Sequence, residues 1–127
     1  CYGVKSQNNL LDNWLSNMRN MYAIANERGI AFLSFCQPVL YSKKRKSLRE
    51  KNILLSMYNR SISNDMKGSF RECIRQKKDL PEYIYDLSHI FDGKSDVYMD
   101  WCHVWEKGNR IIAEEIKKII LPRINVK

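Results

Sequence analysis

The chain has few of the features that mark specialised protein classes. Its 127 residues include three prolines, five glycines and four cysteines, and no Cys-x-x-Cys pair occurs. No apolar run approaches the roughly 18 to 20 residues that a membrane span requires. Internal repeats and low-complexity segments are also missing. We therefore expect one soluble domain covering residues 1–127, without a disulfide framework or a membrane span.

The cysteines lie too far apart to suggest a metal centre. Cys1, Cys36, Cys73 and Cys102 are separated by about 30 residues or more, whereas structural zinc sites use clustered ligands, so we predict buried or idle thiols and no metal site. Cys102-His103 with the distant His89 is the nearest approach to a zinc pattern. The chain begins at Cys1 without a recognisable leader, which favours a fragment or processed product.

Positive charge exceeds negative charge. Lys and Arg total 22 against 14 Asp and Glu, for a net charge of +8, and the densest cluster is Lys43-Lys44-Arg45-Lys46. Such a surface could attract nucleic acid or anionic lipid. The basic residues alternate with hydrophobic ones at helical spacing, and no nucleic-acid motif accompanies them. We therefore favour a solvated helical face over nucleic-acid binding.

Apolar periodicity predicts helices separated by short strands. A helical stripe runs from Asn9 to Glu27 and stops at Gly29, a candidate left-handed cap. A second helix is predicted to open at Ser47, with Glu50 completing a capping box, and to continue to about Lys78. A final helix is predicted to open at Gly108-Asn109 and to end at Pro122. The predicted strands are Ile30–Cys36 and Tyr83–Leu87, with a turn at Asp92-Gly93.

This order of elements belongs to the α/β class, in which parallel strands are covered by helices on both faces. Two strands cannot complete such a sheet. The simplest interpretation is the C-terminal portion of a larger doubly wound domain, rich in helix within this fragment.

One block near the C-terminus has a specific chemical pattern. Asp100-Trp101-Cys102-His103 is followed by Gly108 and Ala113 and is preceded by an apolar strand ending in Gln37-Pro38, by Tyr85-Asp86-Leu87, by Asp92 and by Asp96-Val97-Tyr98. In serine hydrolases an imidazole takes the hydroxyl proton, and a carboxylate fixes that imidazole's tautomer. Together these residues resemble the Asp-x-x-His end of the SGNH/GDSL family of serine esterases.

The resemblance implies a flavodoxin-like three-layer sandwich and hydrolysis of esters, including O-acetyl groups on carbohydrate. His103 would be the general base and Asp100 its orienting carboxylate. No cofactor is implied. The family's Gly-Asp-Ser block and its oxyanion-hole glycine and asparagine have no match here, and Ser34, Ser42 and Ser88 lack the surroundings of a nucleophile elbow. The resemblance therefore implies a second polypeptide that carries the serine.

Each of these residues also has a simpler interpretation. His103 could be a surface histidine, and Asp100 could cap a turn by accepting backbone N–H groups. Trp101 and Trp105 flank the histidine and could form the wall of a substrate pocket, although core packing is the stronger interpretation. Two other functions are alternatives to the hydrolase interpretation. The chain could be a basic helical module that binds nucleic acid or an anionic membrane, or a noncatalytic subunit that completes another chain's sheet.

Overall fold

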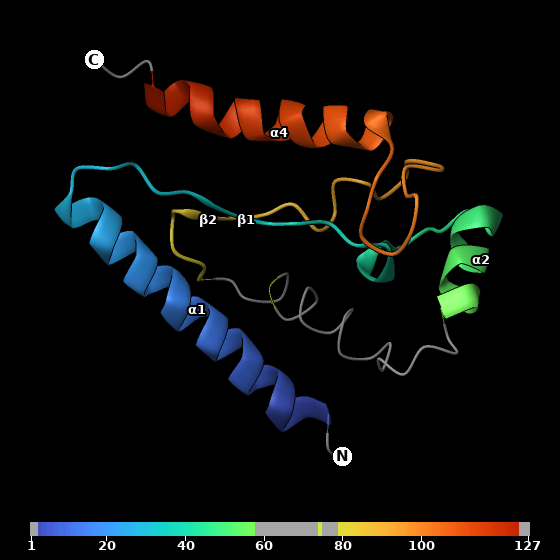
Figure 1. The fold of residues 1–127 in the computed structure, drawn as a ribbon, viewed down its shortest axis with the longest axis horizontal. Coiled ribbons are helices and arrows are strands. Elements are labelled where there is room, and N and C mark those ends of the chain that lie inside the picture. Colours follow the sequence, from blue (N-terminus) through green and yellow to red (C-terminus); the bar gives the residue numbers. More distant parts are fainter. Residues whose placement is uncertain (1–2, 58–73, 75–78, 125–127) are drawn as a thin grey trace.

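The computed structural model describes residues 3–57, 74 and 79–124, and for residues 3–10 and Met57 it describes the backbone alone. Within these residues the fold is mixed α/β, with three α-helices, one short 3₁₀ helix and a two-stranded parallel sheet. Figure 1 shows α1 (Gly3–Glu27) and α4 (Glu106–Ile124) on opposite sides of the strand pair. The predicted α/β class is confirmed at this level.

Helix α1 covers one face of the sheet. Leu11 and Leu15, one helical turn apart, are buried in a cluster with Cys36 and Ile84 from the strands. The helix ends in a Schellman motif, because the Ile30 N–H bonds the Ala25 carbonyl at 2.9 Å and the Gly29 N–H bonds the Asn26 carbonyl at 3.0 Å. Gly29 has φ +65°, so the predicted left-handed cap is confirmed.

The two strands are β1 (Ser34–Cys36) and β2 (Ile84–Asp86), paired in parallel with Ser34 opposite Ile84. Both are shorter than the predicted strands. The expectation that Ile30–Cys36 forms one strand is wrong for its first four residues, and Ile30 is 59% exposed. A ladder requires a partner, and in the described part of the chain only three residues of β2 pair with this run.

Alternation along the strands places different residues on the two faces. Ser34 Oγ contacts Met18 Sδ of α1 at 3.2 Å. On the other face the Phe35 and Tyr85 rings stack with centroids 5.5 Å apart, and Arg123 of α4 lies over Tyr85. The pair of strands therefore sits between two helices.

The second core cluster lies beyond the carboxyl ends of the strands. Leu40, from the 3₁₀ helix Leu40–Ser42, is buried with Phe91, Val97 and Tyr98, and α2 (Leu48–Met57) and α4 pack partly buried residues against them. This cluster supports the loop that carries the Asp-x-x-His block. The predicted turn is also present, with Gly93 at φ +82°. The predicted continuation of the second helix toward Lys78 lies mostly outside the described residues.

Helix α4 differs from its predicted bounds at both ends. It begins at Glu106 instead of Gly108, because Glu106 supplies the acidic side chain of the first turn and Gly108 packs inside the helix against Val104. It passes through Pro122 and ends at Ile124. Proline has no N–H to donate to the Lys118 carbonyl, so the last turn of α4 lacks one backbone hydrogen bond. None of the described helices has the length of apolar sequence that a bilayer crossing requires.

Candidate functional site

The Asp-x-x-His block lies on a closed loop. Tyr98 and Val104 form an antiparallel bridge, and the Met99 N–H bonds the His103 carbonyl at 2.8 Å. The loop is also tied to the segment after β1. The Leu40 N–H bonds the Trp101 carbonyl at 2.9 Å, and Gln37 Nε2 donates to the Cys102 carbonyl at 3.3 Å. The loop is thus held at the carboxyl end of the parallel sheet, where α/β folds commonly bind ligands.

Asp100 organises the turn with both carboxylate oxygens. Its Oδ1 accepts the N–H groups of Cys102 at 2.8 Å and His103 at 2.7 Å, and its Oδ2 lies 2.7 Å from His103 Nδ1. Burial acts to raise the pKa of Asp100, but the hydrogen bond from the His103 side chain and the two backbone hydrogen bonds outweigh it and lower the pKa from 3.8 to about 2. Asp100 is therefore a carboxylate at neutral pH.

The imidazole of His103 is oriented by this carboxylate. A carboxylate accepts hydrogen bonds only, so in the neutral imidazole it favours the proton on Nδ1 and leaves the lone pair on Nε2. No hydrogen bond from a described residue reaches Nε2, and the His103 side chain is 73% exposed. The structure therefore brings the predicted pair of side chains together. It also favours the tautomer that a general base needs, with the lone pair on Nε2. The catalytic role itself stays a prediction.

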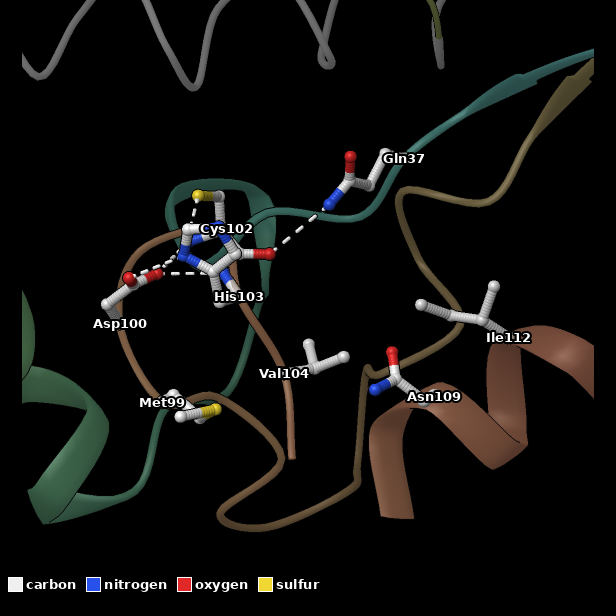
Figure 2. Close-up of a pocket in the computed structure, with 8 residues that line it drawn as sticks. All are labelled: Gln37, Met99, Asp100, Cys102, His103, Val104, Asn109 and Ile112. Atoms are coloured by element: carbon white, nitrogen blue, oxygen red, sulfur yellow. Dashed lines mark hydrogen bonds and ion pairs between the residues drawn. The ribbon is translucent and has the colours of Figure 1, made fainter. Parts of the chain in front are cut away.

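A pocket of about 360 Å³ opens beside this pair. Its volume is at the lower end of the range typical of small-molecule sites. Figure 2 shows Asp100, Cys102 and His103 gathered on the loop, with Asn109 and Ile112 contributed by α4. The lining consists of Gln37, Met99, Asp100, Cys102, His103, Val104, Asn109 and Ile112.

Two amide side chains in this lining were not predicted as site residues. Gln37 follows β1 and Asn109 lies in the first turn of α4. A sequence signal existed for Gln37, because residues that follow parallel strands gather at one edge of a sheet. For Asn109 the predicted helix start at Gly108-Asn109 suggested a role at the end of the helix, whereas the helix in fact begins two residues earlier.

The two tryptophans beside His103 lie elsewhere than in this lining. The Trp101 ring is 6.1 Å from the Tyr41 ring, and the Arg49 guanidinium lies 5.3 Å from the centre of the Trp105 ring. Trp101 is half-buried and Trp105 is 40% exposed. The apolar part of the pocket wall is formed instead by Met99, Val104 and Ile112. A contact of either tryptophan with substrate stays a prediction.

The serine hydroxyls considered from the sequence have other surroundings. Ser34 Oγ contacts Met18, Ser42 Oγ donates to the Val39 carbonyl at 2.9 Å, and Ser88 is buried. None of the three lines the pocket beside His103. Among the described residues the pocket is therefore lined by the predicted base and its predicted orienting acid, and by no serine.

Cys102 belongs to the same cluster. Its Sγ lies 3.6 Å from His103 Nδ1, and the ligand atoms of Asp100, Cys102 and His103 all lie within 4.8 Å of one another. The weak zinc pattern seen in the sequence paired Cys102-His103 with His89. In the structure His89 instead has its Nδ1 3.9 Å from Asp86 Oδ2, and Asp100 completes the cluster.

Comparison with known proteins adds no relative: no protein-family model, curated protein or solved structure matches this chain.

Proposed function

We propose that this chain supplies the general base and its orienting carboxylate to an SGNH/GDSL-type serine hydrolase that cleaves small esters, including O-acetyl groups on carbohydrate. His103 is the base and Asp100 the orienting group. The two described strands and their flanking helices are the C-terminal part of a flavodoxin-like three-layer sandwich. The parallel pairing of β1 with β2, and the helices on both sides, support this architecture.

The observation that carries the proposal is the 2.7 Å hydrogen bond between Asp100 Oδ2 and His103 Nδ1. In a serine hydrolase the acid bonds one ring nitrogen so that the other can accept the nucleophile's proton. Cys102 is a poor substitute for the serine, because its Sγ approaches Nδ1, the nitrogen that Asp100 already holds. The arrangement favours a nucleophile that meets Nε2 from the pocket side.

The proposed reaction follows from these positions. Nε2 of His103 takes the proton of the serine hydroxyl as its oxygen attacks the ester carbonyl, and the imidazolium that forms is stabilised by Asp100. His103 then returns the proton to the departing alcohol. Water hydrolyses the acyl-enzyme by the same two proton transfers. The pocket's amides, Gln37 and Asn109, can hydrogen-bond polar groups of the substrate, while Met99, Val104 and Ile112 accept its apolar part.

The serine is supplied by a second polypeptide that joins this one. Removing any member of a triad costs several orders of magnitude in turnover, so the isolated chain is expected to be almost inactive. The native assembly, purified through this chain, is therefore the material to test. The measurement is p-nitrophenyl acetate turnover, with a fluorophosphonate probe to label the activated serine.

His103→Ala is expected to abolish both turnover and probe labelling, and Asp100→Asn to lower kcat by roughly 10³ to 10⁴-fold, as loss of the orienting acid does in serine proteases. His89→Ala is the matched control, because His89 is also exposed and also lies near an aspartate, Asp86. It should leave turnover unchanged. Turnover that survives His103→Ala, or an assembly with neither turnover nor a labelled serine, would overturn the proposal.

A further inference from the structure

The loop places three metal-binding side chains of different chemistry within reach of one point. A thiol, an imidazole and a carboxylate come from Cys102, His103 and Asp100, and their ligand atoms lie within 4.8 Å of one another. We propose that these three residues bind a thiophilic divalent cation with the coordination chemistry of zinc. This binding does not depend on the proposed hydrolase activity.

Two of the three separations between ligand atoms are close to those of a tetrahedral site, and the third is known to lie within 4.8 Å. With metal bonds of about 2.3 Å to sulfur and 2.0 Å to nitrogen, tetrahedral angles place the two ligand atoms about 3.5 Å apart. Cys102 Sγ and His103 Nδ1 are already 3.6 Å apart. The third ligand must move further, because Asp100 Oδ2 is 2.7 Å from Nδ1 and a tetrahedral site needs about 3.3 Å. Both side chains of that pair are exposed, at 42% and 73%, so they can rotate toward a common ion without repacking the core.

The ligand set selects the metal. Thiolate and imidazole favour zinc and its relatives over magnesium or calcium, which prefer all-oxygen sites. Three protein ligands on an exposed loop also leave a fourth position for water, the arrangement of open zinc sites. Backbone contacts support the ligands. Asp100 Oδ1 keeps the N–H groups of Cys102 and His103, and Gln37 holds the Cys102 carbonyl.

Binding rearranges protons in a defined way. The Cys102 thiol loses its proton to solvent and coordinates as thiolate. His103 coordinates through Nδ1, so the proton that Nδ1 shares with Asp100 must move to Nε2. The metal thus takes the place of that proton, and one proton is released for each ion bound by the neutral imidazole.

The same ion would switch off the proposed base, since a proton on Nε2 blocks acceptance of the serine proton. This consequence rests on the proposed function, whereas the metal site does not. Failure of the two ideas is therefore distinguishable: direct metal binding tests the site, and esterase turnover tests the hydrolase.

Co²⁺ is the probe, because a cysteine thiolate bound to Co²⁺ gives a near-ultraviolet charge-transfer band and a tetrahedral site gives intense visible bands. The intact chain is titrated under reducing conditions, and Zn²⁺ is then added as competitor. Cys1, Cys36 and Cys73 are replaced by alanine so that Cys102 is the only thiol. Both sets of bands should appear at one equivalent of Co²⁺ and disappear with one equivalent of Zn²⁺.

Cys102→Ser should remove the charge-transfer band, and His103→Ala and Asp100→Ala should each weaken Zn²⁺ binding by at least about 10-fold, the loss that even an outer-shell deletion causes. His89→Ala is the control and should bind normally. If the three-alanine background fails to fold, Cys102→Ser in the original chain gives the same test as a difference spectrum. Absence of the band, or a band that survives Cys102→Ser, would overturn the proposal.

Discussion

Lys43 Nζ lies 2.6 Å from both carboxylate oxygens of Glu50, and the two side chains are only 1% and 0% exposed. The most basic segment of the chain is therefore partly turned inward. Lys46 contributes to the same interior region, donating to the carbonyls of Tyr41 and Lys43. Burial, acting more strongly than the nearby charges, lowers the pKa of Lys46. Two of the four cations in the Lys43–Lys46 cluster thus make contacts within the fold. Fewer charges of this cluster are therefore left to bind the phosphate groups of a nucleic acid.

Breaking this buried pair should destabilise the protein strongly. Glu50→Gln keeps an acceptor for the Ser47 N–H but leaves the Lys43 charge buried without a counter-ion. We expect the free energy of unfolding to fall by about 3 to 5 kcal/mol in urea denaturation. Lys43→Met combined with Glu50→Gln should recover part of the loss, because no buried charge remains. A single variant as stable as the original would contradict the pair's burial.

Ser47 caps helix α2 and also ties it to a distant turn. Its Oγ accepts the Glu50 N–H at 3.2 Å and contacts Asp96 Oδ1 at 2.6 Å. Ser47→Ala should lower the free energy of unfolding by about 1 kcal/mol. Ser56→Ala on the same helix is the comparison, because Ser56 is exposed and its Oγ donates to the Ile53 carbonyl of its own helix. Equal effects of the two substitutions would remove the capping box as an explanation.

Gly108 permits close contact between α4 and the loop that carries His103. A Cβ at position 108 would lie 2.7 Å from Val104 Cβ. Gly108→Ala should therefore cost about 1 to 3 kcal/mol despite the better helix propensity of alanine. In a Val104→Gly background the same substitution should be neutral or stabilising. Ala113→Gly, at an exposed position of α4, measures the contribution of helix propensity alone. If the effects of Gly108→Ala and Val104→Gly on the free energy of unfolding are additive, the contact between the two residues is contradicted.

The acidity of Asp100 reports on the geometry of the site in metal-free protein. Its pKa of about 2 lies below the ordinary 3.8 because of the hydrogen bonds that it accepts. A depressed carboxyl pKa means that the stabilisation from this group is complete above about pH 4 and is lost as the pH falls through about 2. Carboxyl chemical shifts in an NMR titration measure the pKa directly. His103→Ala should raise it, while His89→Ala should not, and titration of Asp100 at or above 3.8 would refute the arrangement.

Local patterns in the sequence predicted the local structures well. The Schellman end of α1 at Gly29, the turn at Gly93 and the Ser47–Glu50 capping box are all present. Each depends on residues a few positions apart, so neighbouring side chains and glycine's freedom at positive φ are enough to specify it. The Asp100–His103 hydrogen bond belongs to this group, since only two residues separate Asp100 from His103 along the chain.

Element lengths were predicted less well, because they depend on partners. Apolar composition favoured a strand from Ile30, but pairing with β2 exists only from Ser34. Gly108 suggested a helix start, whereas its missing side chain is used for contact with Val104 inside the helix.

The amino-acid sequence by itself determined the turns, the caps, the α/β character and the candidate acid and base, because these arise from short-range hydrogen bonds and from periodicity. Only the tertiary structure decided that Gln37 meets the Cys102 carbonyl 65 residues later and that Lys43 is buried. These features depend on which distant segments pack together and on which polar groups become buried. Neither can be read from the local pattern of residues along the chain.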